Sequence, residues 1–75
     1  MYTIRMTAEA MRGLRTIPSG VVGHVTAAIQ TLAYNPRPAG CQELGGNYYR
    51  ISEWGHVIEY EIVEREIFIR IVFVG

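Results

Sequence analysis

The C-terminal part of the chain, residues 47–74, alternates apolar and polar side chains with a period of two. This period places successive side chains on opposite faces of a β-strand. Tight turns at Trp54–Gly55 and Glu64–Arg65 divide the region into three strands. They are "NYYRIS" (47–52), "HVIEYEIV" (56–63) and "EIFIRIVFV" (66–74). This part of the chain is therefore restricted to an antiparallel sheet, one face of which must be covered.

The N-terminal part of the chain is predicted to form the helices that cover this face of the sheet. After a short strand, "MYTIRM" (1–6), Thr7 is predicted to cap a helix over 8–17. Pro18 suits the first turn of a second helix that runs to about residue 34. Residues 35–46, "NPRPAGCQELGG", are turn-forming and predict a loop. The expected fold is α+β, one domain over 1–75, with the order β-α-α-β-β-β and a helical hairpin on one face of an antiparallel sheet.

The turn positions predict which side chains share a face of the sheet. Arg50 is expected opposite Glu59, and Glu59 opposite Arg70, so that the glutamate lies between two arginines. The covered face is expected to hold Tyr49, Ile51, Ile58, Tyr60, Ile62, Ile67, Ile69, Ile71 and Phe73. The uncovered face is expected to hold, besides these charged residues, Tyr48, Ser52, Val57, Glu61, Phe68, Val72 and Val74.

Composition limits the classes of function. The only cysteine, Cys41, excludes an internal disulfide, and no signal peptide or membrane-spanning run is present, so we expect a cytoplasmic protein. Cys41, His24 and His56 lack metal-ligand spacing, and no metal or cofactor is expected. The net charge is zero, whereas nucleic-acid binders usually carry a basic excess. Residues 1–50 hold five of the seven arginines and 51–75 five of the seven glutamates, so any such excess is local.

Four segments carry a family resemblance over residues 2–74. In their order and spacing, "AEAMRGLRTIP", "AIQTLAYNPRPAG", "ELGGNYYRIS" and "HVIEYEI" resemble the RelE/ParE superfamily, the toxins of bacterial type II toxin–antitoxin systems. For the RelE branch, the resemblance implies an mRNA interferase: a ribosome-dependent endoribonuclease that cuts mRNA in the ribosomal A site and inhibits translation. For the ParE branch, it implies a non-enzymatic inhibitor of DNA gyrase. Both imply an antitoxin partner that wraps and silences the toxin.

The RelE residues are only partly matched. Arg50 occupies the basic position of the "YYR" motif, but Ser52 stands at the next basic position and Val57 at that of the central arginine. The resemblance places a further arginine and a tyrosine in a tail after the last strand, and this chain ends at Gly75. We therefore expect a domain that lacks this tail and has a reduced catalytic set.

The candidate catalytic residues are Arg50, Glu59 and Arg70. The arginines would hold the phosphate, and Glu59 would act as general base on the 2′-hydroxyl. The simpler alternative is a ladder of cross-strand ion pairs on a solvated sheet face, where Glu61 adds further negative charge. The candidate RNA contacts are Tyr48, by stacking on a base, and Arg12 and Arg15, together with Arg5. The alternative is that Tyr48 only covers the sheet surface and that the arginines are solvated surface charges.

Apolar side chains on the uncovered face, such as Val57 and Phe68, are expected to need a partner, either an antitoxin or a second copy of the chain in a homodimer. The last strand, 66–74, is expected at an open edge suited to strand addition. Three functions remain: a RelE-type nuclease of reduced activity, a ParE-like gyrase inhibitor, and a truncated inactive relative that binds a partner.

Overall fold

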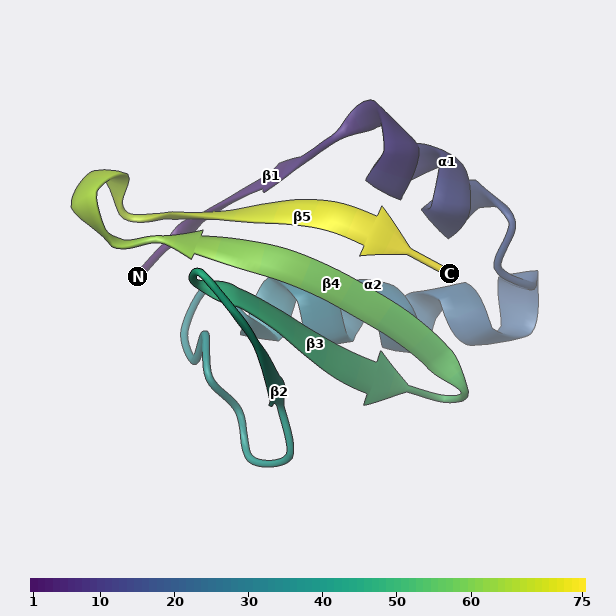
Figure 1. Cartoon of the computed structure of the whole chain (residues 1–75). Coiled ribbons are helices and arrows are strands. Elements are labelled where there is room, and N and C mark those ends of the chain that lie inside the picture. The colour runs from purple at the N-terminus through teal and green to yellow at the C-terminus, as the bar shows by residue number, and fades with distance from the viewer.

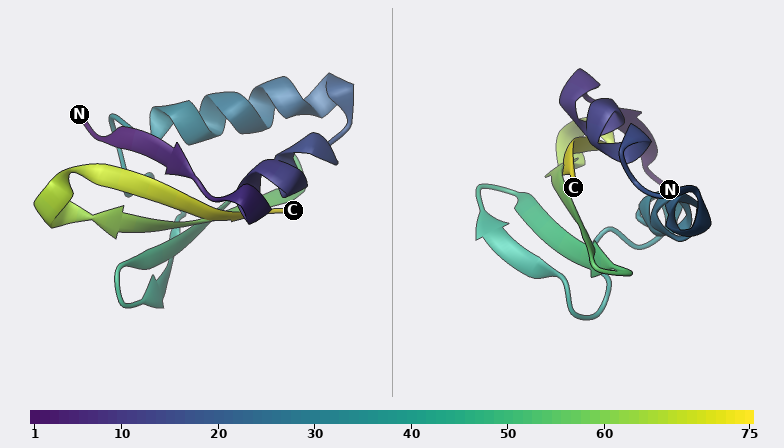
Figure 2. Two further views of the ribbon diagram at one scale, coloured as in Figure 1. Left: turned by 90° about the horizontal axis from the view of Figure 1, so that it is seen from above. Right: turned by 90° about the vertical axis from the view of Figure 1, so that its right-hand side faces the viewer.

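The computed structural model describes all 75 residues as a five-stranded sheet with two helices on one face (Figures 1 and 2). The strand order is β1-β5-β4-β3-β2. The elements are β1 (Thr3–Met6), α1 (Ala8–Arg15), α2 (Ser19–Thr31), β2 (Gln42–Gly45), β3 (Tyr48–Glu53), β4 (His56–Val63), the 3₁₀ turn η1 (Glu64–Glu66) and β5 (Phe68–Val74). The α+β class and the helical hairpin on one face are confirmed. Neither helix is long and apolar enough to cross a membrane.

Two parts of the sheet differ from the expectation. First, β1 pairs with β5 in parallel, so the sheet is mixed rather than wholly antiparallel. The connection between these two strands is long, as a parallel pair requires, because both helices and β2, β3 and β4 lie between them in the chain. Second, residues 42–45, expected as loop, form β2 against β3. Positive φ angles at Gly45, Gly46 and Asn47 make the reversal that pairs them, a conformation that glycine adopts without steric cost.

The β3–β4 register is as predicted, with Arg50 opposite Glu59, but the β4–β5 register is not. The connection between β4 and β5 contains η1 and Ile67, whose backbone is left-handed. It is therefore longer than the two-residue turn expected. Arg70 therefore lies opposite Glu61, two residues from the predicted partner Glu59. A shift of two keeps Arg70 on its predicted face.

A β-bulge changes the faces at the end of β5. One extra residue, Val72, lies between the pairs Tyr60–Ile71 and Glu59–Phe73. Val74 is consequently buried, at 1% exposure, and Phe73 is 37% exposed, the reverse of the prediction for both. Ile67, also predicted in the core, is 55% exposed because it belongs to the turn.

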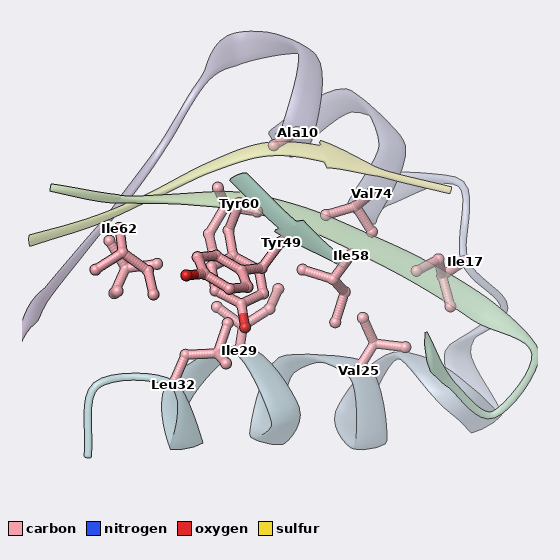
Figure 3. Close-up of a cluster of buried hydrophobic side chains, with 12 residues drawn as sticks. Ala10, Ile17, Val25, Ile29, Leu32, Tyr49, Ile58, Tyr60, Ile62 and Val74 are labelled. Carbon is pink, nitrogen blue, oxygen red and sulfur yellow. The ribbon is translucent and has the colours of Figure 1, made fainter. Parts of the chain in front are cut away.

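The core lies between the sheet and the two helices, where α2 points apolar side chains at β3 and β4 (Figure 3). Helix α1 approaches β5 so closely that a Cβ on Gly13 would lie 1.8 Å from the carbonyl oxygen of Val74. Thr7 caps α1 as predicted, accepting from the Ala10 amide and donating to the Val72 carbonyl. The core residues are Ala10, Ile17, Val25, Ile29, Leu32, Tyr49, Ile58, Tyr60, Ile62, Ile69, Ile71 and Val74.

Polar contacts hold the loop at 35–41 against one end of the sheet. The Tyr60 hydroxyl donates to the Pro36 carbonyl at 2.7 Å. Arg37 donates to the Tyr49 hydroxyl at 3.1 Å and to Glu64 at 3.0 Å. Burial raises the pKa of Tyr60 well above its ordinary value, so this hydroxyl remains a donor over the physiological range.

Candidate functional site

The sheet face that the helices leave open, here called the outer face, carries two rows of side chains that lie opposite one another across the strands. The first row runs from β1 to β3 and consists of Arg5, Arg70, Glu61 and Tyr48. The second row runs from β5 to β2 and consists of Phe73, Glu59, Arg50 and Gln42. All three predicted catalytic residues lie in these rows, which confirms that they share a face.

Each of the three guanidinium nitrogens of Arg50 donates a hydrogen bond to a neighbouring side chain. Its Nε and Nη2 atoms both donate to Oε2 of Glu59, at 3.0 and 2.8 Å, and Nη1 donates to the Gln42 side chain at 3.3 Å. The side chains of Arg50 and Glu59 are 38% and 28% exposed. An ion pair this open to solvent contributes about 1 kcal/mol or less, so a competing anion can replace the carboxylate at small cost.

Arg70 forms a separate ion pair, because its Nη1 atom donates to Oε1 of Glu61. The predicted arrangement, with Glu59 bridging Arg50 and Arg70, is therefore wrong. The longer β4–β5 turn moves Arg70 to the neighbouring row, and each arginine has its own glutamate. This is the ladder of cross-strand pairs that the sequence left as the simpler alternative.

Phe68 and Arg5 form a feature of the outer face that the sequence did not reveal. Phe68 was expected to be bare but is only 2% exposed. The Arg5 guanidinium lies 4.0 Å from the centre of its ring, and that of Arg70 lies 5.2 Å from the same centre. Arg5 has no carboxylate within ion-pair distance. Only the pairing of β1 with β5 brings these residues together, and no local signal predicts it.

The predicted RNA contacts divide between the two sides of the molecule. Tyr48 lies in the first row, opposite Glu61, with 38% of its surface exposed. Arg12 and Arg15 are exposed on α1, which covers the other face of the sheet (Figure 2). They make no ion pair, and the structure does not join them to the charged rows.

The remaining surface offers fewer groups suited to binding a ligand or to catalysis. A groove of about 200 Å³ between α2 and β3 contains no cationic side chain. It is lined by Ala28, Thr31, Leu32, Pro38, Ala39, Ile51, Ser52 and Glu53. No group of three or more His, Cys, Asp or Glu side chains gathers to hold a metal ion.

The expectation that the last strand is an open edge is wrong, because β5 lies between β1 and β4.

No protein-family model and no curated protein sequence matches the chain. Solved structures do match. The isolated E. coli RelE toxin aligns with a TM-score of 0.87 at 18% identity, over 100% of this chain and 83% of that one. The RelBE2 toxin–antitoxin complex from Mycobacterium tuberculosis gives 0.85 at 21%, over 99% and 95%. The archaeal RelE–RelB complex from Pyrococcus horikoshii gives 0.83 at 17%, over 99% and 92%.

These similarities define the class of fold: the chain has the RelE fold over essentially its full length. The predicted resemblance is therefore confirmed in its RelE branch at the level of fold. The matching structures named above are RelE toxins or their complexes with antitoxins, and the ParE alternative is not favoured.

Proposed function

We propose that this chain is the toxin of a type II toxin–antitoxin pair and acts as a RelE-type, ribosome-dependent endoribonuclease on mRNA. The observation that carries the proposal is the RelE fold along the whole chain, with two arginine–glutamate pairs on its open sheet face. The proposed partners are a cognate antitoxin and mRNA in the ribosomal A site. This activity belongs in the cytoplasm, where ribosomes are.

In the proposed mechanism, the two ion pairs are the form that the site takes before RNA binds. Arg50 and Arg70 exchange their carboxylate partners for oxygens of the scissile phosphate and stabilise the charge that develops in the transition state. Glu59, released from Arg50, takes the proton of the 2′-hydroxyl as its oxygen bonds to phosphorus. The bond from phosphorus to the 5′-oxygen breaks, which leaves a 2′,3′-cyclic phosphate, and the 5′-oxygen takes a proton from water. The partial exposure of both pairs keeps the cost of this exchange low.

The test is a cell-free translation reaction with a defined mRNA, in which new 5′ ends are mapped by primer extension. The full chain is expected to produce cuts only when ribosomes occupy the message. Arg50→Ala and Arg70→Ala are each expected to slow cleavage by about 100-fold or more, because each removes a phosphate-binding cation. Glu59→Gln is expected to slow it by about the same factor, since the amide cannot accept the proton.

Arg65→Ala is the matched control, because it removes an arginine from η1, away from both rows. Cleavage that persists at the normal rate in the Arg50 and Arg70 variants would show that the outer face is not the active site.

A second candidate function is a toxin-like fold that binds an antitoxin and does not cleave. It is favoured by the occupation of both outer-face pairs and by Ser52 and Val57, which stand where the RelE resemblance implies basic residues. An intact message in the translation reaction would favour this candidate. The same protein should then be added to purified gyrase, where loss of DNA supercoiling would restore the ParE-like alternative.

A further inference from the structure

Arg5 and Arg70 form a like-charge pair on the outer face. They are direct partners in the parallel register of β1 and β5. Like charges directly opposite each other destabilise a sheet unless a counter-charge is present. Glu61 balances Arg70, but no carboxylate reaches Arg5. The first row therefore holds one uncompensated positive charge in a chain whose net charge is zero.

Phe68 holds this charge in place. The ring is almost fully buried although the helices do not cover its face, and the Arg5 guanidinium lies 4.0 Å from its centre. Stacking on a ring fixes the plane of a guanidinium and leaves its N–H groups free to donate at the edges. The site thus keeps a cation oriented and unpaired before any ligand binds.

Tyr48 completes the row at the other end. It is exposed and lies three strand spacings from Arg5, which corresponds to roughly 14 Å. Cations that contact the backbone and an exposed aromatic ring on which a base can stack are the two kinds of group that bind single-stranded nucleic acid, and the row has both. An acidic peptide would need the cations but not the ring.

We propose that Arg5, held on Phe68 and opposite Arg70, binds a backbone phosphate of single-stranded RNA that lies along the row towards Tyr48. The proposal rests on the proposed function and deepens it, because it assigns a phosphate-binding residue on β1, outside the predicted catalytic set. Arg5 is a binding residue here, whereas Arg50, Glu59 and Arg70 act on the scissile bond.

The experiment measures binding of a short, fluorescein-labelled single-stranded RNA to the full chain by fluorescence anisotropy, at several salt concentrations between about 50 and 200 mM. Arg5→Gln keeps part of the stem over Phe68 and removes the charge. It is expected to weaken binding roughly fivefold to tenfold at the lowest salt and to reduce the slope of log K against log salt by about 0.7, the value for one phosphate contact.

Three further variants sharpen the test. Arg5→Lys restores the charge and is expected to recover most of the slope. Glu61→Gln removes the carboxylate that competes for Arg70 and is expected to tighten binding. Arg65→Ala, the control on η1, is expected to leave the slope unchanged. Circular dichroism of each variant establishes that it is folded.

An equal slope for Arg5→Gln and the wild type, or equal losses for Arg5→Gln and Arg65→Ala, would overturn the proposal. Stronger displacement of the RNA by polyglutamate than by unlabelled RNA would also overturn it and assign the surface to an acidic peptide. The two proposals fail separately. RNA binding that depends on Arg5 without mRNA cleavage would defeat only the nuclease function, and cleavage with an unaltered Arg5→Gln slope would defeat only this inference.

Discussion

At the scale of single residues, this protein depends on two close approaches that composition does not reveal. One is the stacking of Arg5 on Phe68, which converts an apolar residue on an open sheet face into a buried one. The other is the contact of Gly13 with β5, where no side chain fits. Gly13 is the one helical glycine at which packing leaves no room for a side chain. Nothing lies within 4 Å of a Cβ placed on Gly20 or Gly23.

Gly13→Ala is therefore expected to destabilise the protein by about 1–3 kcal/mol, because the added methyl group forces α1 away from the Val74 backbone. Gly23→Ala is the matched control and is expected to stabilise the protein by up to about 1 kcal/mol through helix propensity alone. Urea denaturation followed by circular dichroism measures both. Equal stability of the two variants would show that α1 and β5 are not in contact as described.

At the scale of elements, the loop at 35–41 is held by side chains from β3, β4 and η1. The contact of the Tyr60 hydroxyl with the Pro36 carbonyl is central, because Tyr60 is itself in the core. The loop thus has a fixed position over the end of the sheet although its sequence predicts only turns.

Tyr60→Phe is expected to lower the free energy of unfolding by about 1 kcal/mol, since it removes a hydrogen bond and leaves the carbonyl without this donor. Tyr34→Phe is the control, because Tyr34 is exposed and its hydroxyl makes no hydrogen bond. Thermal or urea unfolding at neutral pH distinguishes the two. An equal effect of both substitutions would mean that the loop is not held by Tyr60.

The same residue predicts a pH dependence. Burial raises the pKa of Tyr60 in the folded state above the ordinary value of about 10. Its contribution to stability is complete below that ordinary value, because the hydroxyl is then protonated in both states. As the pH rises further, the unfolded chain loses the proton first, so stability falls. Urea midpoints above pH 10 should fall more steeply for the wild type than for Tyr60→Phe, and parallel curves would contradict this.

At the scale of the whole molecule, β5 is the centre of the structure. It pairs with β1 on one side and β4 on the other, and α1 packs against it. By contrast, β2 is an edge strand whose four residues are all exposed. A chain of 75 residues has one small core, so stability is expected to be concentrated around β4 and β5.

Native-state hydrogen exchange tests this distribution. The hydrogen-bonded amides of β4 and β5 are expected to exchange only by global unfolding, with opening free energies equal to that from urea denaturation. Those of β2 are expected to exchange by local opening, at free energies several kcal/mol lower. Protection of β2 as strong as that of β5 would show that the sheet opens as one unit.

Much of the fold could be predicted because its signals are local. The period of two in 47–74, the helical spacing before it and the Thr7 cap each act within a few residues, and they determine the helical hairpin and the strands β3, β4 and β5. The two-residue turn at Trp54–Gly55 likewise determines the β3–β4 register, and with it the pair of Arg50 and Glu59. This half of the candidate site was determined by the sequence.

The other half was decided only by tertiary structure. The register of β4 and β5 depends on a 3₁₀ turn and a bulge, neither of which the residues of the connection predict. The partner of Arg70 is therefore Glu61 and not Glu59. The pairing of β1 with β5 joins segments that are more than sixty residues apart along the chain. No periodicity extends over such a separation. Arg5 therefore comes to lie beside Arg70 and Phe68 only when β1 pairs with β5 in the folded sheet.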